Sequence, residues 1–262
     1  MANSGIKTFN QKKEDVRNFL TKHQQKFAEV LPRHIDVRSL IGHFMYSVGK
    51  NPKIAECSPE SIGLSIMTAA TMGLKPDGRE GCLIPFKGTC QFIPMYRGLI
   101  KLAWMSDKIA SINARAVREN DEFDWQDGTN GYVRHTVPNI TDEERGPLAY
   151  AWATYQTTSG GSGFRVLTKD QVLKRMRESK SARYDDSPWN TWPDEMWTKT
   201  ALKSLESVIP CGPDFAAAVA HDNMIDTLEP TQVISPALIE VGDRDTGDAA
   251  SSSVADKLRS KA

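Results

Sequence analysis

Helix-like and strand-like segments are segregated along this chain, and this order constrains the fold more than any single motif. Apolar residues recur at helical spacing on both sides of a middle region, residues 82–167, in which short strand-like segments are separated by glycine-containing turns. Strands grouped between two sets of helices are typical of the α+β class. We therefore predict a central, mostly antiparallel sheet with hairpins, packed with helices and flanked by helical N- and C-terminal lobes.

Three helices are predicted before the strands. The first lies within residues 10–29 and the second within residues 36–48. The third has the clearest start, because Ser58 can cap the helix and Pro59 fits the first helical position. It should end just before Gly73, which can adopt the left-handed conformation that closes many helices.

The middle and C-terminal segments are assigned by the same reasoning. Gly88 and the Ser159-Gly-Gly-Ser-Gly163 run each predict a hairpin turn between two strands. The predicted strands cover residues 82–86, 90–95, 109–118, 132–137, 148–157 and 164–167, and the predicted helices cover residues 96–106, 168–180, 193–209 and 214–227.

The composition changes after Pro230, where Ser, Asp, Gly and Ala dominate and aromatic residues are absent. Such a segment offers too little apolar surface to offset chain entropy, so we predict that residues 230–262 are largely disordered. We divide the chain into an N-terminal helical segment (1–30), a core (31–229) and this acidic tail. The tail is predicted to act as a solubilising linker, to dock a partner, or to compete with a polyanionic ligand for the basic part of the chain.

Formal net charge is zero, but the charge is unevenly distributed. From Gly212 onward there are 9 Asp and Glu against 4 Lys and Arg, a balance of −5, which leaves +5 for residues 1–211. A basic body with an acidic tail favours a polyanionic partner, although many solvated surfaces look similar.

The sequence predicts a cytoplasmic protein. No apolar run approaches the roughly 20 residues that cross a bilayer, and the polar N-terminus lacks the apolar core of a secretory signal. The four cysteines form no CxxC pair, which favours reduced thiols over a zinc site.

Tyr96-Arg97-Gly98 stands where a predicted strand passes into a helix. A helix N-terminus carries partial positive charge and free N–H groups, so a cation there is slightly unfavourable and an anion is favoured. Arg97, Lys101 and Trp104 share one face of the helical wheel. Cations with an aromatic ring suit single-stranded nucleic acid, whereas a solvated face with Arg97 in a salt bridge is the alternative.

Further basic residues appear in the C-terminal half. Lys199 and Lys203 lie one turn apart on the predicted helix 193–209, where ion pairs with Glu195 and Glu206 could also explain them. A basic cluster on the preceding predicted helix includes Lys174 and Arg175, and it is either a solvated face or a binding site. Arg115 and Arg118 fall on opposite faces of a strand, so one of them at most should share a surface with Arg97.

Enzyme signatures are few. Gly49-Lys50 is followed by Asn51 and lacks the glycine spacing of a phosphate-binding loop, which excludes that class of NTPase. Asp121, Glu122 and Asp124 raise a metal-dependent nuclease as an alternative, but acids after a strand are more often turn residues. A structural oligomer without a nucleic-acid role is the other alternative.

Several short motifs together resemble the RecT family of phage recombinases, over roughly residues 31–210. They occur in this order: Leu31-Pro-Arg-His34, Gly73-Leu-Lys-Pro76, Leu83-Ile-Pro-Phe86, Tyr96-Arg-Gly98, Ala114-Arg-Ala-Val-Arg-Glu-Asn-Asp-Glu-Phe123, and Pro188-Trp189 followed by Glu195-Met196 and Lys199-Thr-Ala201.

The resemblance implies a protein that is not an enzyme and anneals single strands without ATP or any other cofactor; a dependence on Mg²⁺ stays open. It implies single-stranded DNA and the annealed duplex as ligands, and homo-oligomeric rings or helical filaments. Partners would be a phage exonuclease and a single-strand binding protein in the host cytoplasm. DNA would lie in a basic groove between the helical lobes and the sheet.

The resemblance also implies site residues. Tyr96 and Arg97 match the family's Tyr-Arg-Gly, and Arg115 and Arg118 match its Arg-x-x-Arg strand. Trp189 matches the tryptophan of its Pro-Trp. The whole predicted DNA-binding set is Tyr96, Arg97, Lys101, Trp104, Arg115, Arg118, Lys174, Arg175, Trp189, Lys199 and Lys203.

Overall fold

The computed structural model describes residues 8–30, 36–185 and 187–227. Within them the chain has the predicted α+β architecture of helices and small antiparallel sheets. The predictions made for the tail, residues 230–262, and for the motif at residues 31–34 fall outside this part of the chain.

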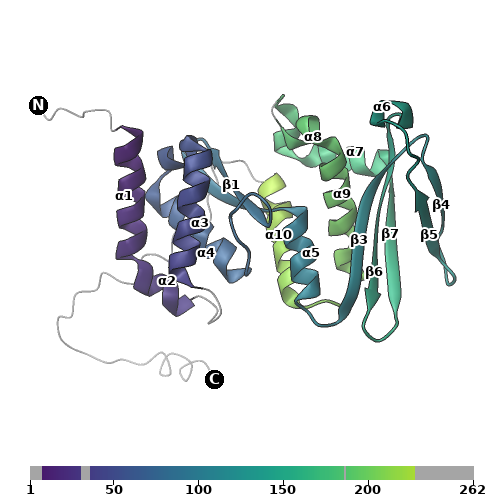
Figure 1. Ribbon diagram of the computed structural model, residues 1–262, viewed down its shortest axis with the longest axis horizontal. Helices are drawn as coiled ribbons and strands as arrows, with labels where there is room; N and C mark the ends of the chain where they lie inside the picture. Colours follow the sequence, from purple (N-terminus) through teal and green to yellow (C-terminus); the bar gives the residue numbers. More distant parts are fainter. Residues whose placement is uncertain (1–7, 31–35, 186, 228–262) are drawn as a thin grey trace, which may run out of the picture.

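The molecule is elongated, with a helical lobe at one end and the larger set of strands at the other (Figure 1). The N-terminal capping box of Thr8 and the Asp36 side chain start two of the lobe's helices, as polar N-caps do. The lobe consists of α1 (Phe9–Lys22), α2 (Gln24–Val30), α3 (Val37–Lys50), η1 (Pro52–Glu56) and α4 (Pro59–Thr71).

Both boundaries predicted for α4 are confirmed. The Ser58 side chain accepts a hydrogen bond from the Ser61 backbone, and Gly73 adopts a φ of 68° after the Met72 C-cap. The first predicted helix differs, because the chain breaks at His23 into α1 and α2.

The predicted glycine hairpin joins this lobe to the rest. β1 (Gly81–Phe86) pairs with β2 (Thr89–Pro94), and Lys87 and Gly88 form the turn with positive φ angles of 47° and 81°. Positive φ at both central turn residues matches the twist of the two strands.

The main sheet has the order β3-β6-β7, from β3 (Ile109–Arg118), β6 (Leu148–Thr157) and β7 (Ser162–Thr168). All of its pairs are antiparallel. Ala114 lies opposite Ala153 and Ala116 opposite Ala151, so one face is lined by small side chains. Helix α9 (Pro193–Ser204) packs on this face, because alanines allow its backbone to come close.

One strand was missed by the sequence analysis. The acids after β3 were interpreted as turn residues, but β4 (Glu122–Gln126) pairs with β5 (Tyr132–Thr136) as a separate hairpin. Phe123 of β4 lies against Tyr150, with ring centroids 5.2 Å apart. In this strand, charged residues alternate with Phe123, which packs inward, and Trp125, which is exposed.

The remaining helices surround these strands. The predicted helix 193–209 ends five residues early, at Ser204, and continues as a 3₁₀ turn. No described helix has the length and apolar character needed to cross a bilayer. The remaining helices are α5 (Tyr96–Trp104), α6 (Asp142–Arg145), α7 (Lys169–Glu178), η2 (Lys180–Arg183), α8 (Pro188–Thr191), η3 (Leu205–Ser207) and α10 (Pro213–Thr227).

Candidate nucleic-acid interface

The start of α5 presents a cation without a carboxylate partner. Met95 is the N-cap residue, and no side chain caps it. The Arg97 side chain is exposed, and its Nε donates to the Tyr96 hydroxyl oxygen at 3.0 Å. No acid within the described residues forms an ion pair with Arg97. The salt bridge considered as an alternative explanation of Arg97 is therefore not present.

Gly98 is required by the close approach of α5 to the loop before β1. A Cβ at this position would lie 2.1 Å from the Glu80 carbonyl oxygen, which any larger residue could occupy only by moving the backbone. The same carbonyl accepts a hydrogen bond from the Met95 N–H at 2.9 Å. The loop thus fixes the position from which Arg97 projects.

Lys101 ties the next turn of α5 to the same loop. Its Nζ donates to Glu80 Oε2 at 2.7 Å and to the Gly73 carbonyl at 2.9 Å. This lysine shares the face of Arg97, as the helical wheel predicted, but its charge is already paired within the chain.

Trp104 completes the exposed face of α5. It is 56% exposed, whereas Leu99, Leu102 and Ala103 on the opposite side are buried. The amphipathic interpretation of this helix is confirmed, and its outer face offers Arg97 at the first turn and an indole at the last.

The two arginines of β3 have different surroundings. Arg115 is exposed and lies opposite Trp152, on the sheet face away from α9. Arg118 is held in place: its guanidinium donates to Asp194 at 2.8 Å and to the Gly146 carbonyl at 2.9 Å. Since Asp194 lies in the first turn of α9, Arg118 fastens that helix to the sheet.

The two lysines of α9 form a buried charge network with α10. Lys199 Nζ lies 2.6 Å from Asp222 Oδ1, and Lys203 Nζ lies 2.6 Å from Asp222 Oδ2 and 3.3 Å from Asp226. The Lys199 side chain is only 9% exposed and that of Asp222 only 2%. Helix-surface pairs with Glu195 and Glu206 were the sequence interpretation, and it is wrong about the partners.

The network sets the protonation states of its members. Burial alone would raise the pKa of Asp222, but the two ammonium groups lower it below its ordinary value. Burial would lower the pKa of Lys199, but Asp222 raises it above the ordinary value. Burial, then the neighbouring Asp222, raises the pKa of Asp226. Lys199 and Asp222 are therefore both charged at neutral pH.

Asp222 and Asp226 were not singled out from the sequence. The signal was present, since two aspartates four residues apart match two lysines four residues apart. The matching spacing does not predict, however, that the helix with the aspartates lies beside the helix with the lysines.

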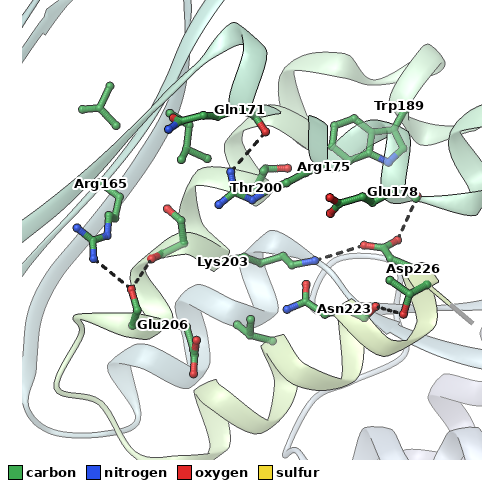
Figure 2. Close-up of a pocket in the computed structure, with 17 residues that line it drawn as sticks. Arg165, Gln171, Arg175, Glu178, Trp189, Thr200, Lys203, Glu206, Asn223 and Asp226 are labelled. Atoms are coloured by element: carbon green, nitrogen blue, oxygen red, sulfur yellow. Dashed lines mark hydrogen bonds and ion pairs between the residues drawn. The ribbon is translucent and has the colours of Figure 1, made fainter. Parts of the chain in front are cut away.

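A pocket of about 630 Å³ between β7, α7, α9 and α10 brings three predicted residues together, namely Arg175, Trp189 and Lys203. Figure 2 shows Lys203 directed at Asp226, with Arg175 beside Gln171. The Trp189 ring is buried, and its indole N–H has no hydrogen-bond partner among the described residues. Arg165 also lines this pocket and was not predicted.

Lys174 and Arg175 both project from α7 into solvent. Neither forms an ion pair within the described residues, so they present the predicted basic cluster to solvent. The exposed cations of the predicted DNA-binding set therefore come from three separate elements, α5, β3 and α7. The other predicted lysines and Arg118 are paired.

The acids considered for a metal site do not converge. Asp121 Oδ2 lies 2.7 Å from Arg145 Nη2 and 3.0 Å from His135 Nε2, and the backbone N–H of Arg118 also donates to it. Within the described residues no group of three or more His, Cys, Asp or Glu side chains is arranged to hold a metal ion.

Comparison with known proteins gives consistent matches. Residues 40–235 match the model of the RecT family. Protein RecT of Escherichia coli (strain K12) is 32% identical over 223 residues, covering 80% of this chain and 81% of the relative. The uncharacterized protein YqaK of Bacillus subtilis (strain 168) is 31% identical over 187 residues, covering 70% of this chain and 62% of the relative. With more than half of its length matched by the family model, the chain belongs to the RecT family.

Proposed function

We propose that this protein binds single-stranded DNA and anneals it to a complementary strand in phage recombination, without ATP and without catalysing a covalent step. Family membership supports annealing in general. The observation that carries the DNA contact is the exposed Arg97 at the start of α5, where no side chain caps the helix and where none of the described acids pairs with the guanidinium. A strand phosphate supplies the anion that no described residue provides at this position.

The exposed residues of the predicted DNA-binding set contact a strand in two ways. Arg97, Arg115, Lys174 and Arg175 neutralise backbone phosphates, and the Trp104 ring offers a surface on which a base can stack. These contacts read no sequence. Base pairing then selects the partner strand and drives annealing, at about 1.4 kcal/mol per stacked step.

The residues whose charges are paired within the chain have a supporting role in this proposal. Lys101 and Arg118 place α5 and α9, and the network of Lys199, Lys203 and Asp222 holds α10 against α9. We expect substitutions of these residues to reduce DNA binding mainly by loosening the elements that carry the exposed cations.

The wider expectations belong to the same proposal. The protein acts as a homo-oligomeric ring or filament in the cytoplasm of a bacterial host, beside an exonuclease that supplies the single strand and a single-strand binding protein. Residues 31–229 form the DNA-binding core. The tail serves as a linker, docks a partner or competes with DNA for the basic groove. Deleting residues 230–262 separates these roles, because lost partner binding with unchanged DNA binding indicates docking and tighter DNA binding indicates competition.

The test is Arg97→Ala, measured by fluorescence anisotropy on a labelled oligonucleotide at several salt concentrations and by annealing of complementary labelled strands. We expect weaker binding and a salt slope reduced by about one phosphate contact. Arg17→Ala on α1 is the matched control, since it removes an exposed arginine at the far lobe. Unchanged affinity and slope in a folded Arg97→Ala protein would refute the assignment.

A further inference from the structure

The exposed side of α3 has a composition that packing within the described chain does not explain. A Cβ at Gly42 or Gly49 would meet no atom within 4 Å. Glycine inside a helix costs about 1 kcal/mol relative to alanine, and no described contact requires it at these positions. The residues of this outer face of α3 are Arg38, Ser39, Gly42, Tyr46, Gly49 and Lys50.

The outer face of α3 is also aromatic and positively charged. Tyr46 is 53% exposed, and the Lys50 ammonium lies 4.8 Å from its ring centroid. Arg38 and Lys50 have no carboxylate partner within the described residues, and the outer face itself contains no acid. This surface is cationic, carries an exposed aromatic ring, and has no side chains at its two glycines. Such a surface is complementary to a partner that is acidic and partly apolar.

A surface with this acidic and partly apolar character lies at the opposite end of the molecule (Figure 1). Residues 119–145, the acidic end, carry eight Asp and Glu against two Arg, a balance of −6. Arg145 is occupied by Asp121, and Arg134 lies 4.9 Å from the Tyr132 ring centroid. Three apolar side chains are exposed beside these charges. They are Trp125, Val137 and Ile140.

We infer that the acidic end of one copy docks on the outer face of α3 of the next copy. Figure 1 places α3 and the β4–β5 hairpin toward opposite ends of the long axis. A contact between two different surfaces leaves one of each free on every pair, so it repeats and builds a ring or an open filament. The inference rests on the assembly expected for the proposed function and names the faces that make it.

A second copy fits the outer face of α3 better than a DNA strand does. Arg38 and Lys50 are twelve residues apart, roughly 18 Å along a helix at 1.5 Å per residue. A single strand carries a phosphate about every 3.4 Å in the helical form, so two cations neutralise few of them. Contact between copies also gives cationic partners to Glu122 and Asp124, which form no ion pair within the described residues; Asp124 accepts only the Tyr132 hydroxyl hydrogen at 2.7 Å there.

The test compares charge-reversed variants without DNA, by sedimentation velocity and mass photometry at low and moderate salt. The wild-type protein should form oligomers that shrink as salt rises. Arg38→Glu with Lys50→Glu, or Glu122→Lys with Asp124→Lys, should each give monomers. Lys169→Glu with Arg177→Glu on α7 is the matched control, since it makes the same charge change on exposed residues elsewhere and should assemble normally.

Rescue identifies the contact. The chain that carries all four reversals should assemble again, because the two charges are exchanged across the same interface. The inference fails if wild-type protein stays monomeric without DNA, if either pair of reversals leaves assembly intact, or if the fourfold variant stays monomeric. Loss of DNA binding by Arg38→Glu with Lys50→Glu, with assembly unchanged, would assign the outer face of α3 to DNA instead.

A second measurement covers variants that fail to fold. A benzophenone amino acid in place of Tyr46 should crosslink to residues 119–145 of another chain, mapped by mass spectrometry, and crosslinks elsewhere would contradict the inference. The outcome is separable from the proposed function, because Arg97→Ala should lose DNA affinity and keep the wild-type oligomer distribution.

Discussion

Helices α5 and α9 look alike in sequence and differ in the structure. Each is amphipathic, with two cations four residues apart. In α5 one cation, Arg97, is exposed and the other, Lys101, is tied to a loop. In α9 both lysine side chains are largely buried and paired with aspartates of α10. A basic helix face is therefore a candidate binding surface only where no other element of the chain supplies the counter-charge.

The largest effect should come from removing the shared counter-charge of α9. Asp222→Ala leaves the Lys199 ammonium buried without a partner, and breaking a buried pair in this way costs about 3–5 kcal/mol. Urea unfolding followed by circular dichroism measures the loss. Glu195→Ala, at the exposed position that the sequence suggested as a partner, is the control and should change stability by less than about 0.5 kcal/mol.

The next largest effect is expected at Gly98, where α5 packs closely against the loop before β1. Gly98→Ala places a methyl group against the Glu80 carbonyl and should destabilise the protein by about 1–3 kcal/mol, because the backbone must shift. Gly42→Ala is the matched control, since its Cβ meets open space, and it should be neutral or stabilising. Equal unfolding midpoints for the two variants would contradict the close approach at Gly98.

The pH dependence separates the two aspartates of α10. The pKa of Asp222 is lowered, so its contribution is present above its unfolded pKa of about 3.9 and is lost as the pH falls further. The pKa of Asp226 is raised, so its contribution is present in acid and is lost as the pH rises through the folded pKa.

Asp226→Asn tests this difference. Wild-type protein should gain stability relative to this variant as the pH falls from 7 toward 4, by less than the effect of Gly98→Ala. Unfolding curves across that range provide the measurement, with Asp222→Asn as the contrasting variant, which should be destabilised at pH 7. A constant difference between wild type and Asp226→Asn would show that Asp226 does not titrate as described.

The smallest effects are expected on the face of α5. Lys101→Met removes a partly exposed pair with Glu80 and should cost about 0–1 kcal/mol, while Arg97→Ala should change stability by less than about 0.5 kcal/mol. Thermal unfolding compares them. A larger stability loss in Arg97→Ala would mean that Arg97 is structural, and its DNA assignment would lose its basis.

Local sequence signals were enough to predict most of the longer helices and strands, together with the caps of α4. Ser58 and Gly73 bound α4, and the alternation in residues 109–118 gives β3, because these signals act between near neighbours. The exposed face of α5 followed in the same way from one helical period. The acidic residues 121–124 were predicted to form a turn, but the segment forms β4, in which charged residues alternate with aromatic ones.

The tertiary structure alone decided which of the predicted basic residues remain free. Arg97, Arg115, Lys174 and Arg175 are exposed. Lys199 and Lys203 are paired through contacts about 20 residues away in sequence, with Asp222 on α10. Similar charge patterns occur on many helices. The tertiary position of α10, which contacts α5 and β2, brings its aspartate within 3 Å of the two lysines. Pairing across elements depends on how helices pack, which no short stretch of sequence encodes.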